Sequence, residues 1–445
     1  MKDTISIIGG GLSGSLLAIY MAKRGFQVNL FERRPDMRTN KIYAGKSINL
    51  ALSTRGLRAL ERIGLDKEIL DDAIPMYGRM MHSVEGELSY HAYGKEGQAI
   101  NSVSRGRLNL KLIELASAYE NITMYFNARC IDADLETATA TFEMEDGSHQ
   151  TFKADRIMGT DGAFAATRGK LQITDRFNYS QSYLHVGYKE LAIPAGEAGK
   201  FMMEKNALHI WPRREYMMIA LPNPAGDFTC TLFMPFEGEK SFANLKTRED
   251  VKKFFDEEFA SAVPLMPTLL DDFFNNPTAS LVTVKCFPWT FDHKIALIGD
   301  AAHAIVPFYG QGMNCGFEDC VVLNELIDKH GDDWNAILDE YQALRKPDGD
   351  AIADMAEANF IEMRDKTADK TFLLQKKIEA RFAEKYPDKW IPFYSMVTYS
   401  PHIRYSTALR EGQRQQAIMD KVMATPNIES KWESEEVDQM ILSLL

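Results

Sequence analysis

The sequence predicts an α/β protein in which a Rossmann-like domain is interleaved with an antiparallel-sheet domain and followed by a helical C-terminal region. Two predicted strands run into glycine-containing turns, one near residue 9 and one at Gly299-Asp300. Alternating apolar segments broken by Pro, Gly and Asn occupy residues 183–236, and helix-forming residues dominate after Asp348. Because both turns must converge on one ligand, the domains should be interleaved rather than consecutive.

The first element is a strand over residues 5–8, followed by G-x-G-x-x-G at Gly9, Gly11 and Gly14. The glycines permit a tight turn, close approach of a pyrophosphate to the backbone and close packing of helix on strand. The N-terminus of the next helix, expected over residues 15–24, attracts phosphate charge. This pattern predicts a dinucleotide-binding turn.

The second strand, residues 27–31, ends at Glu32. Its offset of about twenty residues from the glycines is the one at which a carboxylate accepts hydrogen bonds from the ribose of an adenosine. A solvated carboxylate at a strand end is the alternative interpretation of Glu32.

Two later strands also end in aspartate-glycine turns. One runs into Asp161-Gly162, and the other into Gly299-Asp300, followed by a Pro-Gly loop and a helix that opens at Gly312-Met313-Asn314. The second arrangement puts a carboxylate beside free backbone N–H groups, so a polar and partly anionic ligand should bind there. Either turn alone could lack a ligand.

The segments around residues 183–236 predict a sheet that covers a substrate pocket. Met217, Ile219 and Leu221 point the same way by the two-residue period of a strand, and Phe233 on the next strand joins them. Core packing is the alternative for each. In the helical part the spacing i, i+3, i+4 places one set of residues on a single face, with Tyr394 in reach of the same cavity; the set is Asn359, Glu362 and Met363.

Composition excludes several classes of protein. The chain has 445 residues and a net charge of −12 with scattered basic residues, which disfavours a nucleic-acid or anionic-membrane partner. Five cysteines without a C-x-x-C pair indicate reduced thiols, with neither a metal site nor disulfides. We see no signal peptide, and no run approaches the roughly twenty apolar residues of a membrane span. We therefore expect a soluble cytoplasmic protein without a membrane anchor.

The motif order G-x-G-x-x-G…E, then D-G, then G-D is similar to that of the FAD-dependent aromatic hydroxylases. Within that group the chain resembles the kynurenine-hydroxylating members from residue 5 to about residue 405. The resemblance implies hydroxylation of L-kynurenine to 3-hydroxy-L-kynurenine with NADPH and O2 on FAD, through a flavin C4a-hydroperoxide, in tryptophan degradation or NAD biosynthesis. The segments that carry it are GKSINLALS (45–53), MYGRMMH (76–82), SVSR (102–105), HIWPR (209–213), the Gly-Asp segment and FIEMR (360–364).

The resemblance also implies the site residues. Arg79 and Tyr93 hold the substrate carboxylate, and Asn359 and Tyr394 complete the set that binds the amino acid substrate. The flavin itself carries out the oxygen chemistry. Pro307, Phe308 and Tyr309 line the substrate side of the flavin. Together with the glycines, Asp161 and Gly312, the FAD-binding residues are Ser13, Phe31, Glu32, Arg33, Arg34, Ala51, Arg105, Cys130, Asp300, Met313 and Asn314. For Arg105 the alternative is a charge flanking a helix that starts at Leu108.

Two other functions remain open, a hydroxylase of another aromatic acid and a flavin-bearing redox-sensing or interaction protein. Lys46 stands where the resemblance leads us to expect arginine, and the oligomeric state is not predicted. We expect a discontinuous FAD-binding domain over residues 1–70, 98–175 and 280–347, a substrate domain over 71–97 and 176–279, and a helical region over 348–445.

Overall fold

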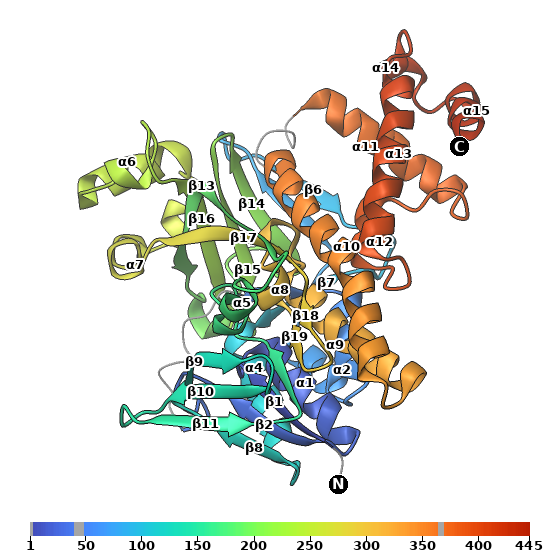
Figure 1. The fold of residues 1–445 in the computed structure, drawn as a ribbon. Coiled ribbons are helices and arrows are strands. Elements are labelled where there is room, and N and C mark those ends of the chain that lie inside the picture. Colours follow the sequence, from blue (N-terminus) through green and yellow to red (C-terminus); the bar gives the residue numbers. More distant parts are fainter. Residues whose placement is uncertain (1–2, 40–48, 364–368) are drawn as a thin grey trace. The chain divides into compact units, whose positions relative to one another are not determined.

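The computed structural model describes residues 3–39, 49–363 and 369–445 (Figure 1). The chain folds into two compact units. Each unit is assembled from three separate segments, so the predicted interleaving is confirmed. Unit 1 comprises Met1–Ile74, Asn101–Leu184 and Ser280–Ala356, and unit 2 comprises Pro75–Ile100, His185–Ala279 and Glu357–Leu445. Residues 357–445 belong to unit 2, together with the strands from β14 (Ala207–Arg213) to β16 (Phe228–Pro235). Lys46 and Arg364 lie outside the described residues.

Unit 1 is built on a mostly parallel sheet in the order β18-β19-β12-β1-β2-β8. The predicted strands at its centre are confirmed, and β2 has the expected bounds. Helix α1 begins three residues before the expected Ser15, because Gly11 takes the N-cap position in an extended conformation. The elements are β1 (Thr4–Ile8), α1 (Leu12–Lys23), β2 (Gln27–Phe31), β8 (Ile122–Tyr125), β12 (Arg156–Gly159), β18 (Thr290–Phe291) and β19 (Ile295–Leu297).

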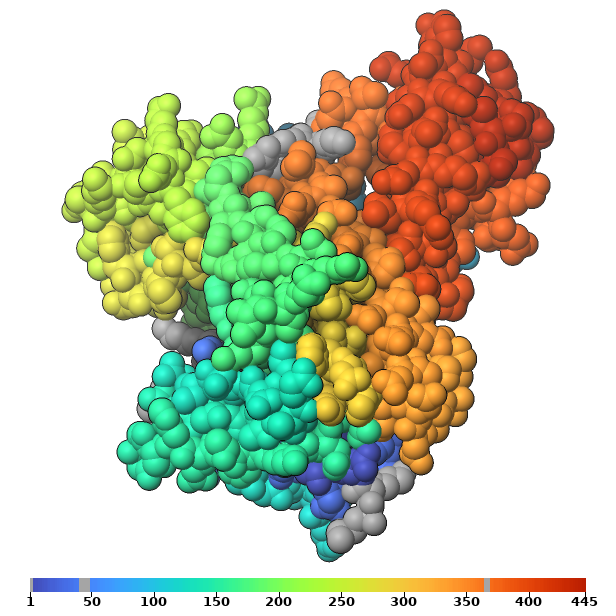
Figure 2. Space-filling view, viewed as in Figure 1, coloured from blue at the N-terminus to red at the C-terminus, as the bar shows by residue number. Residues whose placement is uncertain are grey.

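Smaller elements and helices complete unit 1. Strands β9, β10 and β11 form a small antiparallel sheet, whose residues are visible in teal in Figure 2. The strands are β3 (Asn49–Leu52), β7 (Ile100–Ser104), β9 (Arg129–Asp134), β10 (Thr139–Glu143) and β11 (His149–Lys153). The helices are α2 (Thr54–Glu61), α3 (Asp66–Asp71), α4 (Arg105–Ser117), α5 (Ala166–Leu171), α8 (Asp300–His303), α9 (Gly312–His330) and α10 (Trp334–Ile361), of which the residues from Glu357 on belong to unit 2. Because α4 starts at Arg105, the helix expected from Leu108 begins three residues earlier.

Unit 2 contains the predicted sheet, in the order β13-β16-β15-β14-β5-β6, which is antiparallel except that β14 and β5 run parallel. Helices α6 (Arg248–Glu258) and α7 (Leu269–Asn275) contribute to an apolar core with residues of this sheet, such as Met218 and Leu232. The strands are β4 (Ile74–Met76), β5 (Gly78–His82), β6 (Leu88–Ala92), β13 (Asn178–Ile193), β14 (Ala207–Arg213), β15 (Tyr216–Pro222) and β16 (Phe228–Pro235). Strand β17 (Ala279–Phe287) belongs to unit 1 from Ser280 on.

The C-terminal helices have an apolar core of their own, which includes Phe382, Trp390, Met419 and Ile441. The helical prediction is confirmed, although the expected change at Asp348 falls inside α10. No helix in the described residues combines the length and apolar character that a membrane crossing requires. These helices are α11 (Lys370–Lys385), α12 (Phe393–Thr398), α13 (Tyr405–Met423), α14 (Ile428–Lys431) and α15 (Glu435–Leu444).

Candidate functional site

The three glycines after β1 stand at their positions for different structural reasons. Gly9 has φ +109°, and a Cβ there would lie 2.5 Å from the carbonyl oxygen of Thr160. A Cβ at Gly14 would lie 1.9 Å from the carbonyl oxygen of Gly9. At Gly11, a Cβ would meet no heavy atom of the described residues within 4 Å, and no side chain caps the start of α1. Gly9 and Gly14 therefore serve the fold, whereas Gly11 leaves room for an anion at the helix N-terminus.

The Glu32 carboxylate lies against this turn instead of extending into solvent. Its Oε2 accepts a hydrogen bond from the backbone N–H of Gly10 at 2.9 Å, and its Oε1 accepts one from that of Arg34 at 2.9 Å. Arg33 and Arg34 themselves are exposed. The geometry places a carboxylate beside the glycine turn, where ribose binding requires one; ribose binding itself stays a prediction.

The Phe31 side chain does not face a ligand site. It is 1% exposed and stacks on Phe142, with ring centroids 3.9 Å apart, and on Tyr125 at 4.8 Å. Its carbonyl oxygen accepts a hydrogen bond from the N–H of Gly9 at 2.8 Å. Phe31 can therefore contribute to a cofactor site only through its backbone, because its ring belongs to the core of unit 1.

The Asp161 turn is held by hydrogen bonds within the protein. The Asp161 carboxylate accepts hydrogen bonds from the N–H of Thr167 at 3.1 Å and from its hydroxyl at 2.6 Å, and burial raises its pKa. Burial, and then the charge of Asp161, raises the pKa of Cys130 to about 12. Cys130 is therefore an uncharged thiol near this turn at neutral pH.

Arg168 joins the two aspartate turns, a role that the sequence did not reveal. Its guanidinium donates to the carbonyl oxygen of Ala163 at 2.6 Å and to that of Ala301 at 2.8 Å. Ala163 follows the Asp161-Gly162 turn, and Ala301 follows Asp300. The side chain is 3% exposed. One buried arginine thus fixes the spacing of both motifs, and a contact between residues 133 positions apart has no local sequence signal.

The Gly299-Asp300 turn lies where α1 and α9 approach each other. Gly299 has φ +63°, and Asp300 is exposed at the start of α8. A Cβ at Gly316 on α9 would lie 2.5 Å from the Ser13 hydroxyl on α1, so a glycine is needed for this close contact. Ser13 is therefore a packing residue at the junction as well as a predicted ligand of FAD.

The side chain of Asn314 is committed to the protein. It donates to the carbonyl oxygens of Ala51 and Gly310, both at 2.8 Å, and accepts from the N–H of Ser53 at 3.0 Å. These bonds fix β3 and α2 against the start of α9. Because no side chain caps α9, the first-turn N–H groups at Gly312, Met313 and Asn314 can face a ligand. The predicted role of Asn314 therefore belongs to its backbone.

Other predicted residues of unit 1 lie close to these turns in sequence or at helix starts. Arg105 is exposed at the first position of α4, and it makes no ion pair with the described residues. Phe308 and Tyr309 are each 7% exposed in a single 3-10 turn, whereas Pro307 is exposed. Their place beside the flavin ring stays a prediction.

Unit 2 carries a compact polar cluster around Arg79. The guanidinium carbon of Arg79 lies 5.3 Å from the ring centroid of Tyr93 and 5.3 Å from that of Tyr394. The two rings stack with centroids 5.0 Å apart. Burial raises the pKa of both phenols, which keeps them protonated as hydrogen-bond donors at neutral pH. The structure thus brings together three of the four residues implied to bind the substrate's charged end.

The Arg79 guanidinium does not have all of its hydrogen-bond donors paired with acceptors in the described part of the chain. The Arg79 Nε is buried, and no acceptor in the described part of the chain bonds to it. Burial lowers the pKa of Arg79, but Tyr93, Tyr394 and Glu362 raise it above its ordinary value. Glu362 therefore acts electrostatically on Arg79. A buried donor without a partner is costly, so a ligand acceptor at this position would be stabilising.

Asn359 and Met363 lie on one helical face, as predicted. The Asn359 amide donates to the Met363 sulfur at 3.3 Å, and the two side chains are 8% and 3% exposed. Tyr394 lies on α12, so these predicted substrate residues come from two different helices.

Strand register places the predicted apolar wall on the same face of the sheet as Arg79. Ile219 pairs with Ile210, and Ile210 pairs with Met81, which lies two residues from Arg79. Met217 pairs with Phe233, and Leu221 follows two residues after Ile219. Directly paired residues share a face, so this wall is opposite the face that carries Met218 and Leu232. This register favours a pocket wall over packing against α6 and α7.

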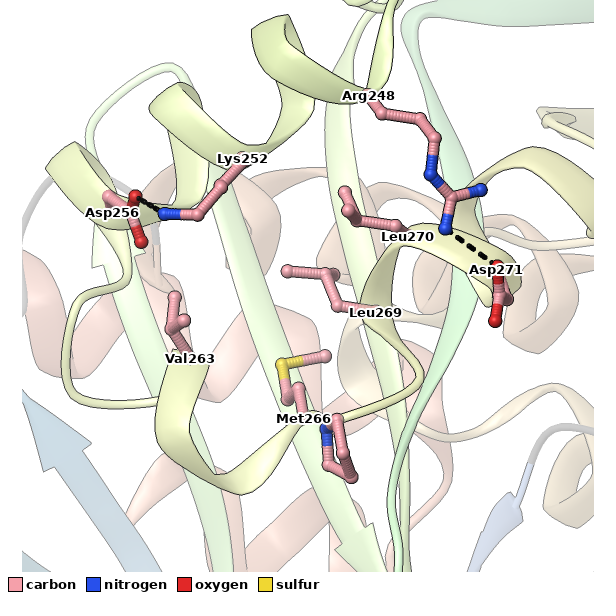
Figure 3. A pocket seen from close by; sticks show the side chains of 9 residues that line it. Arg248, Lys252, Asp256, Val263, Met266, Leu269, Leu270 and Asp271 are labelled. Atoms are coloured by element: carbon pink, nitrogen blue, oxygen red, sulfur yellow. Dashed lines mark hydrogen bonds and ion pairs between the residues drawn. The ribbon is translucent and has the colours of Figure 1, made fainter.

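A hollow of about 200 Å³ lies between α6 and α7 of unit 2 (Figure 3). Its charged residues form the ion pairs Arg248–Asp271 at 2.7 Å and, within α6, Lys252–Asp256 at 2.5 Å. None of the predicted site residues lines it. We therefore assign it no role in binding.

The fold and the cofactor-binding turns define an FAD-dependent monooxygenase, and the family model described as FAD binding domain matches residues 2–356. The chain belongs to the kynurenine 3-monooxygenase family. It is 52% identical to kynurenine 3-monooxygenase of Flavobacterium johnsoniae over 442 residues, covering 99% of this chain and 98% of that one. It is 44% identical to that of Sus scrofa over 424 residues, covering 95% and 89%.

Solved structures support the fold alone. The tetrameric form of 2-methyl-3-hydroxypyridine-5-carboxylic acid oxygenase aligns with a TM-score of 0.67 at 20% identity, covering 88% of this chain and 98% of that one. A variant of Klebsiella pneumoniae HpxO complexed with FAD aligns with a TM-score of 0.68 at 17% identity, covering 90% and 99%. The predicted aromatic-hydroxylase fold is confirmed.

Proposed function

We propose that this protein hydroxylates L-kynurenine to 3-hydroxy-L-kynurenine with FAD, NADPH and O2. The Arg79 cluster carries the proposal, because a guanidinium whose buried Nε lacks an acceptor among the described residues, flanked by two protonated phenols, suits the carboxylate of an amino acid. Relatives between 42% and 52% identical that span nearly the whole chain are named kynurenine 3-monooxygenases.

The substrate's amino acid end is held by polar groups of unit 2. Arg79 binds the carboxylate, and Tyr93 and Tyr394 donate hydrogen bonds to it. Asn359 and Glu362 accept hydrogen bonds from the ammonium group. The aromatic ring then lies against the apolar face, which would exclude water from the bound ring. Met217, Ile219, Leu221, Phe233 and Met363 supply that apolar surface.

The residues of unit 1 fit FAD. The open space at Gly11 and the uncapped start of α1 suit a pyrophosphate, Glu32 suits a ribose, and Asp300 suits the ribityl hydroxyls. Bound FAD supplies the redox and oxygen chemistry, so the protein needs to position and shield rather than to react. The N-terminus of α9 favours negative charge in its vicinity through its dipole.

The test is NADPH consumption by the FAD-loaded protein with and without L-kynurenine, with mass detection of the product. We expect stimulation by L-kynurenine and a product heavier by one oxygen atom. Stimulation with peroxide alone would indicate a hydroxylase of another aromatic acid, which a substrate panel would identify. Bound FAD without stimulation by any aromatic acid would indicate a redox-sensing or interaction protein.

The proposal places the reaction in the cytoplasm. The five cysteines are free in the structure, in keeping with a reducing compartment. Fractionation of the native host, with this protein followed by immunoblot, tests that placement.

A further inference from the structure

A buried group of charged side chains lies directly beneath the Gly299-Asp300 turn in unit 1. Asp319 on α9 is its centre, with 0% of the side chain exposed. Its Oδ2 accepts from the backbone N–H of Gly299 at 2.9 Å and contacts His303 Nε2 at 2.6 Å. Its Oδ1 accepts from Arg345 Nε at 2.6 Å. The carboxylate is therefore bonded to the turn, to α8 and to α10 at once.

The group extends to two further carboxylates and a second arginine. Arg345 donates to Glu318 at 2.7 Å and to Asp348 at 3.2 Å. Glu318 also accepts from Arg55 on α2 at 2.6 Å. The Arg55, Arg345 and Asp348 side chains are at most 2% exposed, and Glu318 is 10% exposed. Unpaired charges cannot persist at such burial, so the balance of charge here decides stability.

His303 supplies the third positive charge of this network. Burial lowers the pKa of His303, but Asp319 and then Cys315 raise it well above its ordinary value. Burial raises the pKa of Asp319, yet His303 and Arg345 hold it below its ordinary value. His303 Nε2 contacts the Asp319 carboxylate, and Nδ1 lies 3.8 Å from Cys315 Sγ. Three cations, Arg55, Arg345 and His303, thus neutralise three anions, Glu318, Asp319 and Asp348.

Metal binding is the competing interpretation, because His303, Cys315 and Asp319 offer ligand atoms within 4.8 Å of one another. Arg345 donates to Asp319 at 2.6 Å and to Cys315 Sγ at 3.2 Å. A guanidinium therefore already supplies positive charge to two of the three ligand atoms, and a metal cation beside it would be repelled. The geometry favours an ion network over a metal site.

We propose that this network is a positioning device for FAD, in which His303, Asp319 and Arg345 fix the Gly299-Asp300 turn and the start of α9 in their ligand-binding conformation. His303, Asp319 and Arg345 are positioning residues, because they act through the backbone of the turn. The inference rests on the proposed function only in taking the ligand to be FAD.

The test compares a single variant that unbalances the charge of the network with a double variant that restores the balance. His303→Gln leaves the network with one excess negative charge, and Glu318→Gln combined with it restores neutrality. We expect His303→Gln to raise the FAD dissociation constant about ten-fold or more, and the double variant to bind FAD more tightly than His303→Gln alone. The readouts are quenching of FAD fluorescence by the apoprotein and the midpoint potential of the bound flavin. The potential should become more negative in His303→Gln and return in the double variant.

The matched control lies on the same helix. His330, near the end of α9, contacts Glu340 at 2.6 Å in a partly exposed pair. His330→Gln, alone and combined with Glu340→Gln, should leave the FAD dissociation constant and the flavin potential unchanged. Both readouts are independent of turnover, so they are informative even if L-kynurenine is not the substrate.

Two results would overturn the inference. One is an unchanged FAD dissociation constant and potential in His303→Gln. The other is a double variant that binds FAD no better than His303→Gln, as loss of packing alone would produce. If His303→Gln does not accumulate as folded protein, Asp348→Asn combined with it must recover soluble, FAD-binding protein; failure of that recovery would also count against charge balance.

Discussion

Gly11 and Gly14 differ in what a methyl group would meet, and this difference predicts opposite phenotypes. At Gly14 a Cβ would lie 1.9 Å from a backbone oxygen, whereas at Gly11 it would meet no described atom within 4 Å. We expect Gly11→Ala to raise the FAD dissociation constant at least about ten-fold without changing the melting temperature of the apoprotein. Gly14→Ala should destabilise the apoprotein itself by about 1–3 kcal/mol, as overpacking does.

Fluorescence titration of FAD and thermal unfolding of the apoprotein measure the two effects separately. Tight FAD binding by Gly11→Ala would show that the open space at this turn is not used by the cofactor.

Removal of the Arg79 side chain should affect binding of one ligand and not of the other. Removing one partner of a buried charge pair costs about 2–5 kcal/mol, so Arg79→Ala should weaken L-kynurenine binding by at least about 30-fold. FAD affinity should be unchanged, since Arg79 lies in unit 2 and the FAD-binding turns lie in unit 1. Isothermal titration with each ligand measures both.

The control for this variant is Arg248→Ala, which removes an arginine of the same unit from an exposed ion pair with Asp271. It should leave both affinities unchanged. Unaltered L-kynurenine affinity in Arg79→Ala would remove the main support for the proposed function.

At the scale of elements, the neighbouring strands β5 and β14 hold a buried histidine pair that should make the protein sensitive to acid. His82 Nε2 and His209 Nδ1 are 2.8 Å apart, and the His82 ring stacks on Trp211 with centroids 3.9 Å apart. Burial, then His209 and Arg213, lowers the pKa of His82 to about 3. The folded state therefore keeps this histidine neutral at pH values where the unfolded chain binds a proton.

The direction of the pH dependence follows from the linkage between proton binding and folding. Because the folded pKa is below the unfolded value, stability is fully present above about pH 6.5 and falls progressively as the pH decreases towards 3. We expect the urea midpoint to fall between pH 7 and pH 5, and to fall less in His82→Gln. His149→Gln, which changes an exposed histidine on β11, should keep the wild-type dependence. Equal slopes in His82→Gln and wild type would contradict the prediction.

Elements were predictable where their signals are local. The glycine turn and alternating residues define β1 and β2, and Gly312 marks the start of α9, all within a few neighbouring residues. The contacts that hold the turns are different in kind. Arg168 reaches Ala301 from 133 positions away, and Arg345 reaches Asp319 from 26. Such contacts depend on the tertiary fold, so the sequence identified the turns and not their supports.

At the scale of the whole molecule, the two predicted binding regions fall in separate units. The cofactor turns belong to unit 1, and the Arg79 cluster belongs to unit 2. Nothing local in the sequence marks Arg79, Tyr93 and Tyr394 as neighbours, and only the family resemblance grouped Tyr394 with Arg79 and Tyr93. Damage confined to unit 2 should therefore affect L-kynurenine binding without affecting FAD binding.

Asp438 on α15 allows that separation to be tested at a distance from both ligands. Its side chain is 0% exposed, and it accepts hydrogen bonds from Arg381 and from Lys385, the latter at 2.8 Å. These contacts join α15 to α11, and α15 also contacts α13, which packs on α12, the helix of Tyr394. Asp438→Asn should destabilise the C-terminal helices by about 1.5–3 kcal/mol, the range for hydrogen bonds to charged groups.

Hydrogen exchange of residues 370–445 should accelerate in Asp438→Asn, and L-kynurenine should bind several-fold more weakly, while the FAD dissociation constant stays at the wild-type value. Glu435→Gln is the matched control, because it removes an exposed partner of the same Lys385, and such surface pairs contribute about 0–1 kcal/mol. Unchanged exchange in Asp438→Asn would show that the buried carboxylate does not stabilise these helices. A parallel loss of FAD affinity would show that the two units are energetically coupled through the C-terminal helices.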